Sequence, residues 1–230
     1  MKISEAYLSI LENVPLFRGI PAEELGDALI RLRASVSGYS AGEYVRLQGD
    51  RADFIGIVLS GTVQILKDDI YGNRQLTAVL HAGEMFAEAF VCAGVRLLPV
   101  DIYAAQDSSV LFLSAACILG GDSKTAGLHY SACSFRPLLT SNLLQILASK
   151  NIFLNRKLQI TSCRTTREKL LAYLGDFAGA SGSREFTIPL NRQQLADYLG
   201  VERSAMSAEL GKMQREGLLV TERSHFKLLF

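Results

Sequence analysis

Residues 191–217, NRQQLADYLGVERSAMSAELGKMQREG, have the pattern of two short helices joined by a tight turn. Asn191 is a residue type that favours a helix N-cap, and Gln194 can reach back to complete a capping box. Gly200 supplies the backbone freedom that a sharp turn requires. This arrangement predicts a helix-turn-helix, the second helix of which enters the major groove of DNA.

The second helix has one apolar side and one polar side. The side chains predicted to be buried are Val201, Met206, Leu210 and Met213. The side chains left facing outward near its N-terminal end, where base edges would be met, are Glu202, Arg203, Ser204, Ser207 and Ala208. Helix pairs with a glycine turn also occur in all-α domains, but the spacing from Ala196 through Gly200 to Met206 favours DNA binding over that alternative.

The segment after Gly217 adds a second signal. Glycine is common just after a helix end. Residues 218–220 and 226–229 then have the composition of two short strands, with a polar turn at residues 221–225 between them. A hairpin in this position predicts a winged helix-turn-helix.

The length and composition suit a regulator of one or two domains. The chain has 230 residues, and its hydrophobic fraction of 49% is enough for buried cores. It contains no run of about 18 uncharged apolar residues, and its first residues do not resemble a signal peptide. We therefore expect a cytoplasmic protein with no membrane partner.

The formal net charge of +1 hides an asymmetry along the chain. Residues 1–133 hold 10 Lys or Arg and 15 Asp or Glu, residues 134–161 hold 4 and none, and residues 162–230 hold 10 and 8. An acidic N-terminal part beside a basic C-terminal part suits a polyanionic partner at one end only.

The cysteines and histidines do not have the spacing of a metal or cluster site. These residues are widely separated in the sequence: Cys92, Cys117, Cys133 and Cys163, and His81, His129 and His225. No CxxC pair or His-x-His pair occurs among them. We expect reduced, mostly buried thiols, no metal and no cofactor.

The N-terminal part alternates short apolar runs with glycine and aspartate turns. The expected strands are residues 43–47, 54–59, 62–66, 75–80, 100–104 and 110–113, preceded by helices at residues 2–13 and 21–32. Regular short strands of this kind predict a β-roll or barrel.

Residues 135–161 contain no glycine, and their apolar residues recur with helical period. A helix of this length is about 40 Å long, more than one small barrel can cover. A second copy of the chain is the simplest partner for the rest of its stripe, and a helix buried along its own domain is the alternative. A further helix over residues 167–177, capped by Thr165 or Thr166, leads to a loop at residues 178–183.

These features together predict an α+β chain in three parts. They are an effector-sensing β-roll (residues 1–133), a dimerisation helix (134–161) and a winged helix-turn-helix (162–230).

At this point the chain resembles the Crp/Fnr transcription regulators over almost its whole length. The resemblance rests on Gln48-Gly49-Asp50, IVLSG at residues 57–61, Gly83-Glu84, TTREKLL at residues 165–171 and the helix-turn-helix. It implies a β-roll of the cyclic-nucleotide-binding type, a long dimerisation helix and a winged helix-turn-helix in each subunit of a homodimer. It also implies that an effector in the roll changes the position of the two DNA-reading helices relative to each other.

The resemblance carries over unevenly to the effector site. In members that bind cyclic nucleotides a Gly-Glu pair holds the ribose and an Arg-Ser pair holds the phosphate; here Ala87-Glu88 and Pro99-Val100 stand at those places. A buried phosphate needs charge-assisted donors, which Pro99 and Val100 cannot supply. Arg96 is close enough in sequence to rescue the site if the loop shifts.

The residues expected to line the pocket instead are Phe86, Ala89, Phe90, Cys92, Pro99 and Val100, with Glu88 as the polar member. Such a lining suits a small, largely apolar or aromatic effector. Two alternatives stay open: these residues simply fill the barrel, or Cys92 senses redox state.

The resemblance carries over better to DNA. Asn191, Arg192 and Gln193 match residues that contact the phosphate backbone, and Val201 and Glu202 would offer backbone N–H groups to a phosphate. Arg203 matches a guanine reader, Ser204 a second reader, and Ser207 lies on the same outward face. Ala208 replaces a frequent further arginine, and Glu209 lowers the positive charge of the helix.

The expected function is a homodimeric, sequence-specific regulator that binds an inverted-repeat duplex and responds to a small molecule other than a cyclic nucleotide. RNA polymerase is a further partner to consider. The alternatives are a cyclic-nucleotide-responsive or redox-responsive regulator of the same family, or a cupin-like barrel enzyme, which would need several histidines where only His81 lies in the strands.

Overall fold

The computed structural model describes residues 4–68, 73–120 and 134–230, so Cys133 and His129 lie outside the described residues. The chain forms two compact units, Met1–Leu147 and Ala148–Phe230, and each is described by itself. The division falls inside the longest helix, α5 (Arg136–Ser162). Within the described ranges, no helix is long and apolar enough to span a bilayer.

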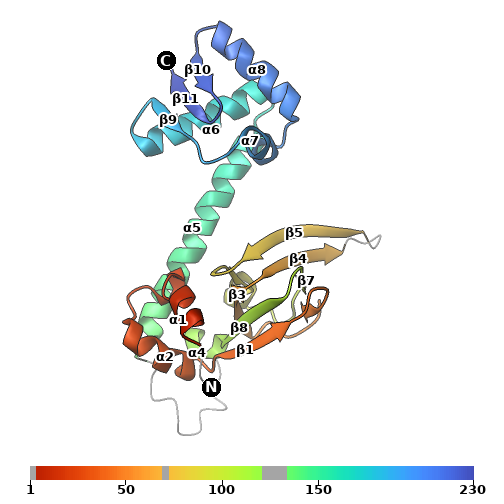
Figure 1. Ribbon diagram of the computed structural model, residues 1–230, viewed down its shortest axis with the longest axis vertical. Helices are drawn as coiled ribbons and strands as arrows, with labels where there is room; N and C mark the ends of the chain where they lie inside the picture. Colours follow the sequence, from red (N-terminus) through yellow and green to blue (C-terminus); the bar gives the residue numbers. More distant parts are fainter. Residues whose placement is uncertain (1–3, 69–72, 121–133) are drawn as a thin grey trace. The chain divides into compact units, whose positions relative to one another are not determined.

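The described residues of the first unit form short helices and eight strands, arranged as Figure 1 shows. Its helices are α1 (Glu5–Leu11), the 3-10 helix η1 (Pro15–Phe17), α2 (Ala22–Arg31), α3 (Glu88–Cys92), α4 (Ala115–Leu119) and the start of α5. Its strands are β1 (Ser35–Tyr39), β2 (Tyr44–Arg46), β3 (Phe54–Ser60), β4 (Thr62–Asp68), β5 (Arg74–His81), β6 (Met85–Phe86), β7 (Asp101–Ala104) and β8 (Ser108–Ser114). The six predicted strands are confirmed, with ends that differ by a few residues.

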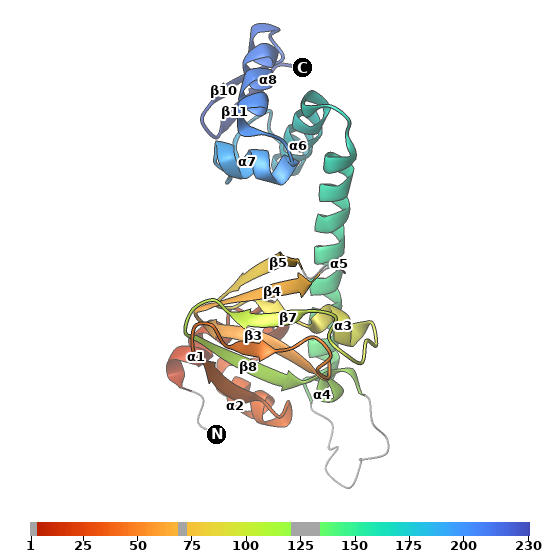
Figure 2. The same cartoon turned by 90° about the vertical axis from the view of Figure 1, so that its right-hand side faces the viewer.

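The strands form two antiparallel sheets, ordered β1-β8-β3-β6 and β2-β7-β4-β5. Because successive side chains of a strand point to opposite faces, β3 divides its residues between two cores. Ile55 and Ile57 pack in a cluster with residues of α1, α2, α4 and α5, whereas Phe54 and Val58 pack in a cluster between the sheets. Figure 2 shows α1 and α2 against the outer face of the sheet that contains β8. The roll is therefore covered by helices on one side and filled by its own side chains.

Helix α5 confirms the predicted long helix within one residue at each end. Leu139 and Leu143, in its first half, are buried in the core of the first unit. Ile160, near its end, is buried in the core of the second unit. Between them, the helix is exposed from Ala148 to Gln159.

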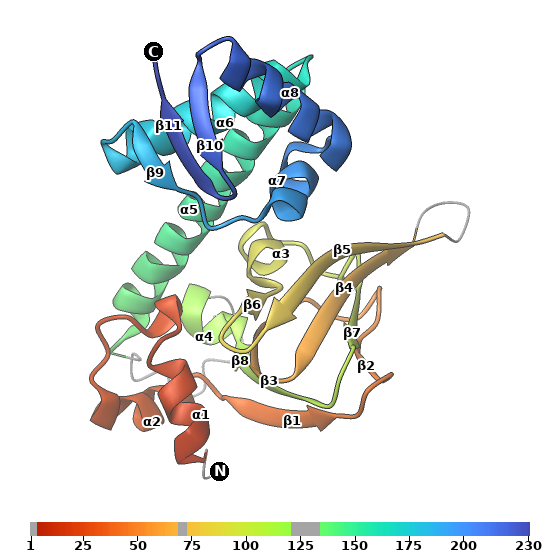
Figure 3. The same ribbon diagram turned by 45° about the horizontal axis from the view of Figure 1, so that its top comes forward.

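The second unit contains three further helices and a small sheet (Figure 3). They are α6 (Thr166–Ser181), α7 (Arg192–Leu199) and α8 (Arg203–Arg215), with the antiparallel strands β9 (Glu185–Thr187), β10 (Leu219–Glu222) and β11 (His225–Leu228) in the order β10-β11-β9. Side chains from all six elements meet in one core around Leu195, Met206 and Phe226. We call the β10–β11 hairpin the wing.

Two predicted boundaries in this unit were wrong, and one strand was not predicted. Helix α6 continues through residues 178–181, which were expected to form a loop, because Phe177 and Ala178 pack on the core and Gly182, with φ +64°, ends the helix instead. The polar turn of the wing is shorter than predicted, since Thr221, Glu222 and His225 extend the paired strands. Strand β9 was not predicted; it pairs with β11 far along the chain.

Candidate DNA-binding surface and effector site

Helix α7 begins as the sequence predicts. The side chain of Asn191 accepts a hydrogen bond from the Gln194 N–H at 3.0 Å, and the Gln194 side chain accepts one from the Asn191 N–H at 2.9 Å. The reciprocal pair satisfies two donors that a helix start leaves free. Gly200, with φ +62°, ends the helix in the left-handed conformation and turns the chain toward α8.

Helix α8 buries one side and exposes the other. Met206, Leu210 and Met213 are almost completely buried in the core. The predicted base-reading residues Arg203, Ser204 and Ser207 are all exposed, and Arg203 is the first residue of the helix. Ser204 donates a hydrogen bond to the Glu202 carboxylate at 2.6 Å, so in this structure its hydroxyl is held at the helix start.

The predicted backbone-contacting residues differ in what their side chains do. Asn191 is used in the cap, and Gln193 is exposed and donates to Asp197 at 2.9 Å. The guanidinium of Arg192 is instead turned toward the wing, where it donates to the Thr221 hydroxyl at 2.7 Å. These three residues therefore do not form one outward-facing group of free donors.

One expectation at the turn is wrong. The N–H of Val201 is not available to a phosphate, because it donates to the carbonyl of Ala196 at 3.0 Å. A hydrogen bond of this kind accompanies the left-handed residue that closes a helix. Glu202, the N-cap of α8, does lie at the helix start as predicted.

Arg167, on α6, was not recognised from the sequence as part of this surface. Its guanidinium forms an ion pair with Glu209 and with Glu216, which both belong to the α8 segment. These hydrogen bonds, first those with Glu216, raise the pKa of Arg167. Arg167 thus neutralises Glu209, the carboxylate that was expected to lower the positive charge of α8. Arg167 lies in the first turn of α6, where a positive charge opposes the helix dipole. This unfavourable position is a sequence signal that Arg167 has an acidic partner outside α6.

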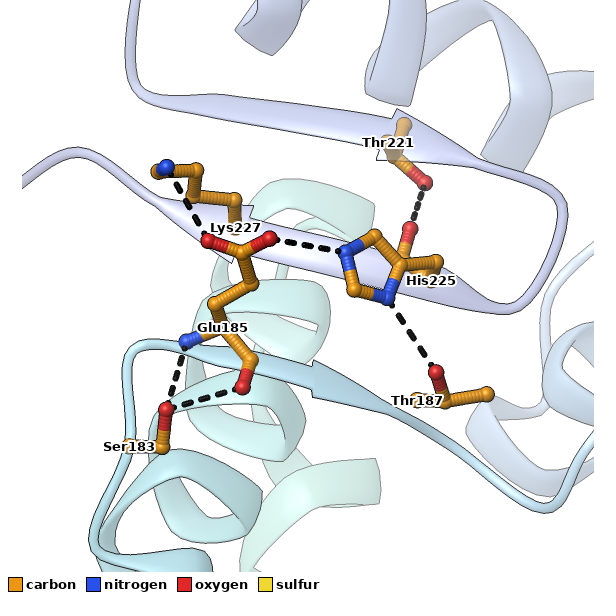
Figure 4. A network of polar contacts seen from close by, with 6 residues as sticks. All are labelled: Ser183, Glu185, Thr187, Thr221, His225 and Lys227. Carbon is orange, nitrogen blue, oxygen red and sulfur yellow. Dashed lines mark hydrogen bonds and ion pairs between the residues drawn. The ribbon is translucent and has the colours of Figure 1, made fainter.

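The wing is tied to β9 by a polar network (Figure 4). Glu185 accepts from Lys227 at 3.0 Å and contacts the His225 ring at 3.3 Å, and the other ring nitrogen of His225 lies 3.1 Å from the Thr187 hydroxyl. Lys227, followed by His225, lowers the pKa of Glu185. Thr221 donates to the carbonyl of His225 at 3.0 Å, which joins the two wing strands near their turn.

In the first unit, three of the predicted effector-binding residues, Glu88, Ala89 and Cys92, belong to the short helix α3. Glu88 begins this short helix and is only 4% exposed. Ala87 precedes it with φ +66°, a left-handed conformation that is strained for a residue with a Cβ. Val100 is buried and Pro99 half-buried, whereas Ala89 and Cys92 are exposed. The structure therefore divides the predicted residues between the interior and the surface.

Phe86 lies inside the roll. Its ring meets those of Phe54 and Phe112 edge to face, with centroids 6.2 and 6.5 Å away. A Cβ added at Gly56 would lie 2.1 Å from the Phe86 ring. The ring thus occupies space that only a glycine leaves open, and Arg46 stacks over the same aromatic group, 4.3 Å from the centroid of Phe112.

Cys92 is exposed as a residue, but its thiol is partly desolvated. This partial desolvation, followed by the nearby Glu88 carboxylate, raises the pKa of the thiol. A redox-sensing cysteine needs the thiolate, which a raised pKa disfavours. Among the residues that the structure describes, no group of three or more His, Cys, Asp or Glu side chains is arranged to hold a metal ion.

Two family models match the chain in the order of its two units. A model described as the cyclic nucleotide-binding domain matches residues 37–120, and one described as the Crp-like helix-turn-helix domain matches residues 168–229. The first covers the roll and the second covers α7, α8 and the wing.

Curated relatives extend the similarity over most of the chain. The "Transcriptional activator protein FnrL" of Cereibacter sphaeroides is 22% identical over 193 residues, which cover 80% of this chain and 72% of that protein. The "Cyclic AMP receptor protein" of Thermus thermophilus is 25% identical over 211 residues, covering 91% and 89%.

The solved structure of DNR from Pseudomonas aeruginosa has the same fold. It superposes with a TM-score of 0.52 at 19% identity, covering 100% of this chain and 96% of that one. The matched domains, their order and the relatives lead to one conclusion: the chain belongs to the Crp/Fnr family of transcription regulators, which bind DNA through a helix-turn-helix and are not enzymes.

Proposed function

We propose that this regulator acts in the cytoplasm as a homodimer that reads an inverted-repeat operator through Arg203, Ser204 and Ser207. The observation that carries this proposal is the exposure of Arg203 at the N-terminal end of α8, on a helix whose other side is anchored in the core. A recognition helix reads base edges with residues at this end. The side chains of Asn191 and Gln193 and the backbone N–H of Glu202 lie near the two helix starts and are the proposed contacts to the DNA phosphate backbone.

The exposed part of α5 supports a homodimer. Leu144, Leu154 and Leu158 are 68%, 61% and 65% exposed. With the half-buried Leu147 and with Asn151 they follow the alternating three-residue and four-residue spacing of a coiled-coil seam. A second copy of α5 would cover these leucines, and a polar residue such as Asn151 within a seam specifies register and oligomeric state.

The region around α3 supports an effector other than a cyclic nucleotide. Pro99 has no N–H, and the side chain of Val100 has neither a charge nor a hydroxyl, so neither side chain can donate to a cyclic phosphate. Glu88 would be the polar member of a site that takes a small apolar or aromatic molecule, with Ala89, Cys92 and Phe86 at its margins. We propose RNA polymerase as a further partner, because a regulator of this type acts on transcription.

Selection from random duplexes tests this function. We expect enrichment of an inverted repeat. The protein bound to it should have twice the mass of one chain. Repeating the titration of the selected duplex with a set of small aromatic and apolar molecules then tests the effector, since a true effector changes operator affinity and raises the melting temperature of the roll. Failure to enrich any sequence over bulk DNA contradicts sequence-specific binding.

A cyclic nucleotide is the second candidate effector. The match of residues 37–120 to the cyclic nucleotide-binding domain favours it, and Arg96, which is exposed near the α3 loop, is the cation that could replace the missing pair. Direct titration, described below, separates the two candidates.

A further inference from the structure

The side chain of Arg192 has unusual surroundings for a DNA-contacting arginine. It is half-buried at the first position of α7, and its guanidinium lies 5.0 Å above the centroid of the Phe226 ring. Phe226 itself is fully buried at the centre of the core. The arginine therefore covers the core at the junction of α7 with the wing.

The hydrogen bonds of Arg192 lead into the wing. Its Nη2 donates to the Thr221 hydroxyl at 2.7 Å, and that hydroxyl donates to the carbonyl of His225 at 3.0 Å. The N–H of Thr221 donates in turn to the side chain of Gln214, on α8, at 3.3 Å. Thr221 is thus the point at which α7, α8 and both wing strands are joined.

The second terminal nitrogen of the guanidinium is enclosed. Within the part of the chain that the structure describes, Nη1 is buried and has no hydrogen-bond partner. Burial lowers the pKa of Arg192. A donor can contact a DNA phosphate only if it is exposed, and Nη1 is buried.

We propose that Arg192 is a positioning residue that holds the wing against the recognition unit, and that it does not contact a DNA phosphate. The planar guanidinium can stack on Phe226 while it donates to Thr221 in its own plane, which a lysine ammonium cannot do. We call the stacking of Arg192 on Phe226 together with its hydrogen bond to Thr221 the brace. With the brace in place, the wing and α8 present their DNA contacts at a fixed spacing. The inference rests on the proposed operator binding.

Three variants separate positioning from phosphate contact. Arg192→Lys keeps the charge and loses the brace, Arg192→Gln loses both, and Thr221→Val loses the brace without touching any charge. Thr221→Ser, which keeps the hydroxyl, is the matched control for the last of these. Arg215→Gln, at the exposed end of α8, shows what removal of one positive charge does by itself.

We expect Arg192→Lys, Arg192→Gln and Thr221→Val to weaken operator binding by a similar factor of about ten, the effect of one hydrogen bond to a charged group. The double variant Arg192→Lys with Thr221→Val should bind the operator no more weakly than either single variant, because both changes break the same link. The slope of log affinity against log salt should stay unchanged in all three. Hydroxyl-radical footprints should lose protection outside the bases read by α8 and keep it within them, a pattern that simple loss of stability does not produce.

The opposite result overturns the inference. If Arg192→Lys and Thr221→Val bind like the wild type while Arg192→Gln flattens the salt slope by about 0.9, Arg192 contacts a phosphate. Hydrogen exchange of the free protein decides independently of DNA: amides of β10 and β11 should exchange faster in Arg192→Lys and Thr221→Val, and equal rates exclude the brace. If the wild type itself enriches no duplex, operator binding fails, and the exchange rates still test the positioning role.

Discussion

Arg167 and Glu216 join the start of α6 to the end of α8 by two parallel hydrogen bonds of 2.7 and 3.0 Å. A guanidinium and a carboxylate that meet in this way fix direction as well as distance. Because Arg167 follows closely on the end of α5, the pair links the segment after the long helix to the helix proposed to read DNA.

Acid should weaken this link. The Arg167 guanidinium holds the pKa of Glu216 below its ordinary value of 4.5. A carboxyl with a lowered pKa in the folded state stabilises the fold above its unfolded pKa, and this contribution is lost as the pH falls through the lowered value. We expect the melting temperature of the wild type to fall more steeply below about pH 4.5 than that of Glu216→Gln. Glu185 has a lowered pKa as well, so Glu185→Gln measures its separate share, and identical curves for wild type and Glu216→Gln would contradict the prediction.

The interior of the roll should not tolerate a methyl group at Gly56. Since the added Cβ would meet the Phe86 ring at 2.1 Å, we expect Gly56→Ala to cost about 1–3 kcal/mol of stability. Gly38→Ala is the matched control, because nothing lies within 4 Å of a Cβ at that strand position. Urea unfolding followed by circular dichroism measures both. Adding Phe86→Leu to Gly56→Ala should recover part of the loss, and an additive result would mean that the ring is not the obstacle.

Charge on the exposed face of α5 should separate the proposed dimer. We expect light scattering to give twice the chain mass of 25.1 kDa for the wild type and the single mass for Leu154→Glu combined with Leu158→Glu, because like charges would face each other in the seam. Gln159→Glu places one negative charge on the exposed helix away from the seam and should remain dimeric. A wild-type monomer that binds the selected operator tightly would exclude this interface.

Arg203 should determine one base pair of each half-site. If it contacts guanine O6 and N7 together, Arg203→Ala should cost roughly 1–3 kcal/mol per half-site and relax the preference at that position. Arg203→Lys keeps the charge and should lose most of the discrimination. Anisotropy titrations on duplexes from a random selection measure this, with half-sites expected about 34–36 Å apart. Unchanged base preference in Arg203→Ala would assign the reading to other residues.

Cyclic AMP and cyclic GMP should bind weakly. With Pro99 and Val100 at the phosphate-gripping positions, we expect dissociation constants no lower than millimolar, a binding free energy weaker than about −4 kcal/mol. Titration calorimetry on the full chain tests this directly. Saturable binding in the micromolar range would reverse the effector proposal, and its loss in Arg96→Ala would then identify the replacement donor.

The features that could be predicted from the sequence are those that neighbouring residues determine. The capping box of Asn191 and Gln194 and the left-handed turn at Gly200 depend on contacts within a few residues, so their residue types are sufficient evidence. The helical period of apolar residues likewise predicted α5, and short apolar runs bounded by glycine and aspartate turns predicted the six strands. The buried side of α8 and the exposure of Arg203 follow from the same rule.

Only the tertiary structure decided the pairings between distant segments. Residues such as Arg167 and Glu216 are 49 positions apart, and no local pattern states that one opposes the other. The same holds for Arg192: the resemblance implied a phosphate contact, and only the tertiary structure places its guanidinium over the Phe226 ring. Strand β9 has only three residues, too few for a periodic signal, and it is ordered by its pairing with β11. The physical reason is common to all of them: a side chain is placed by the partners that the fold brings to it, and those partners lie outside the window in which sequence periodicity operates.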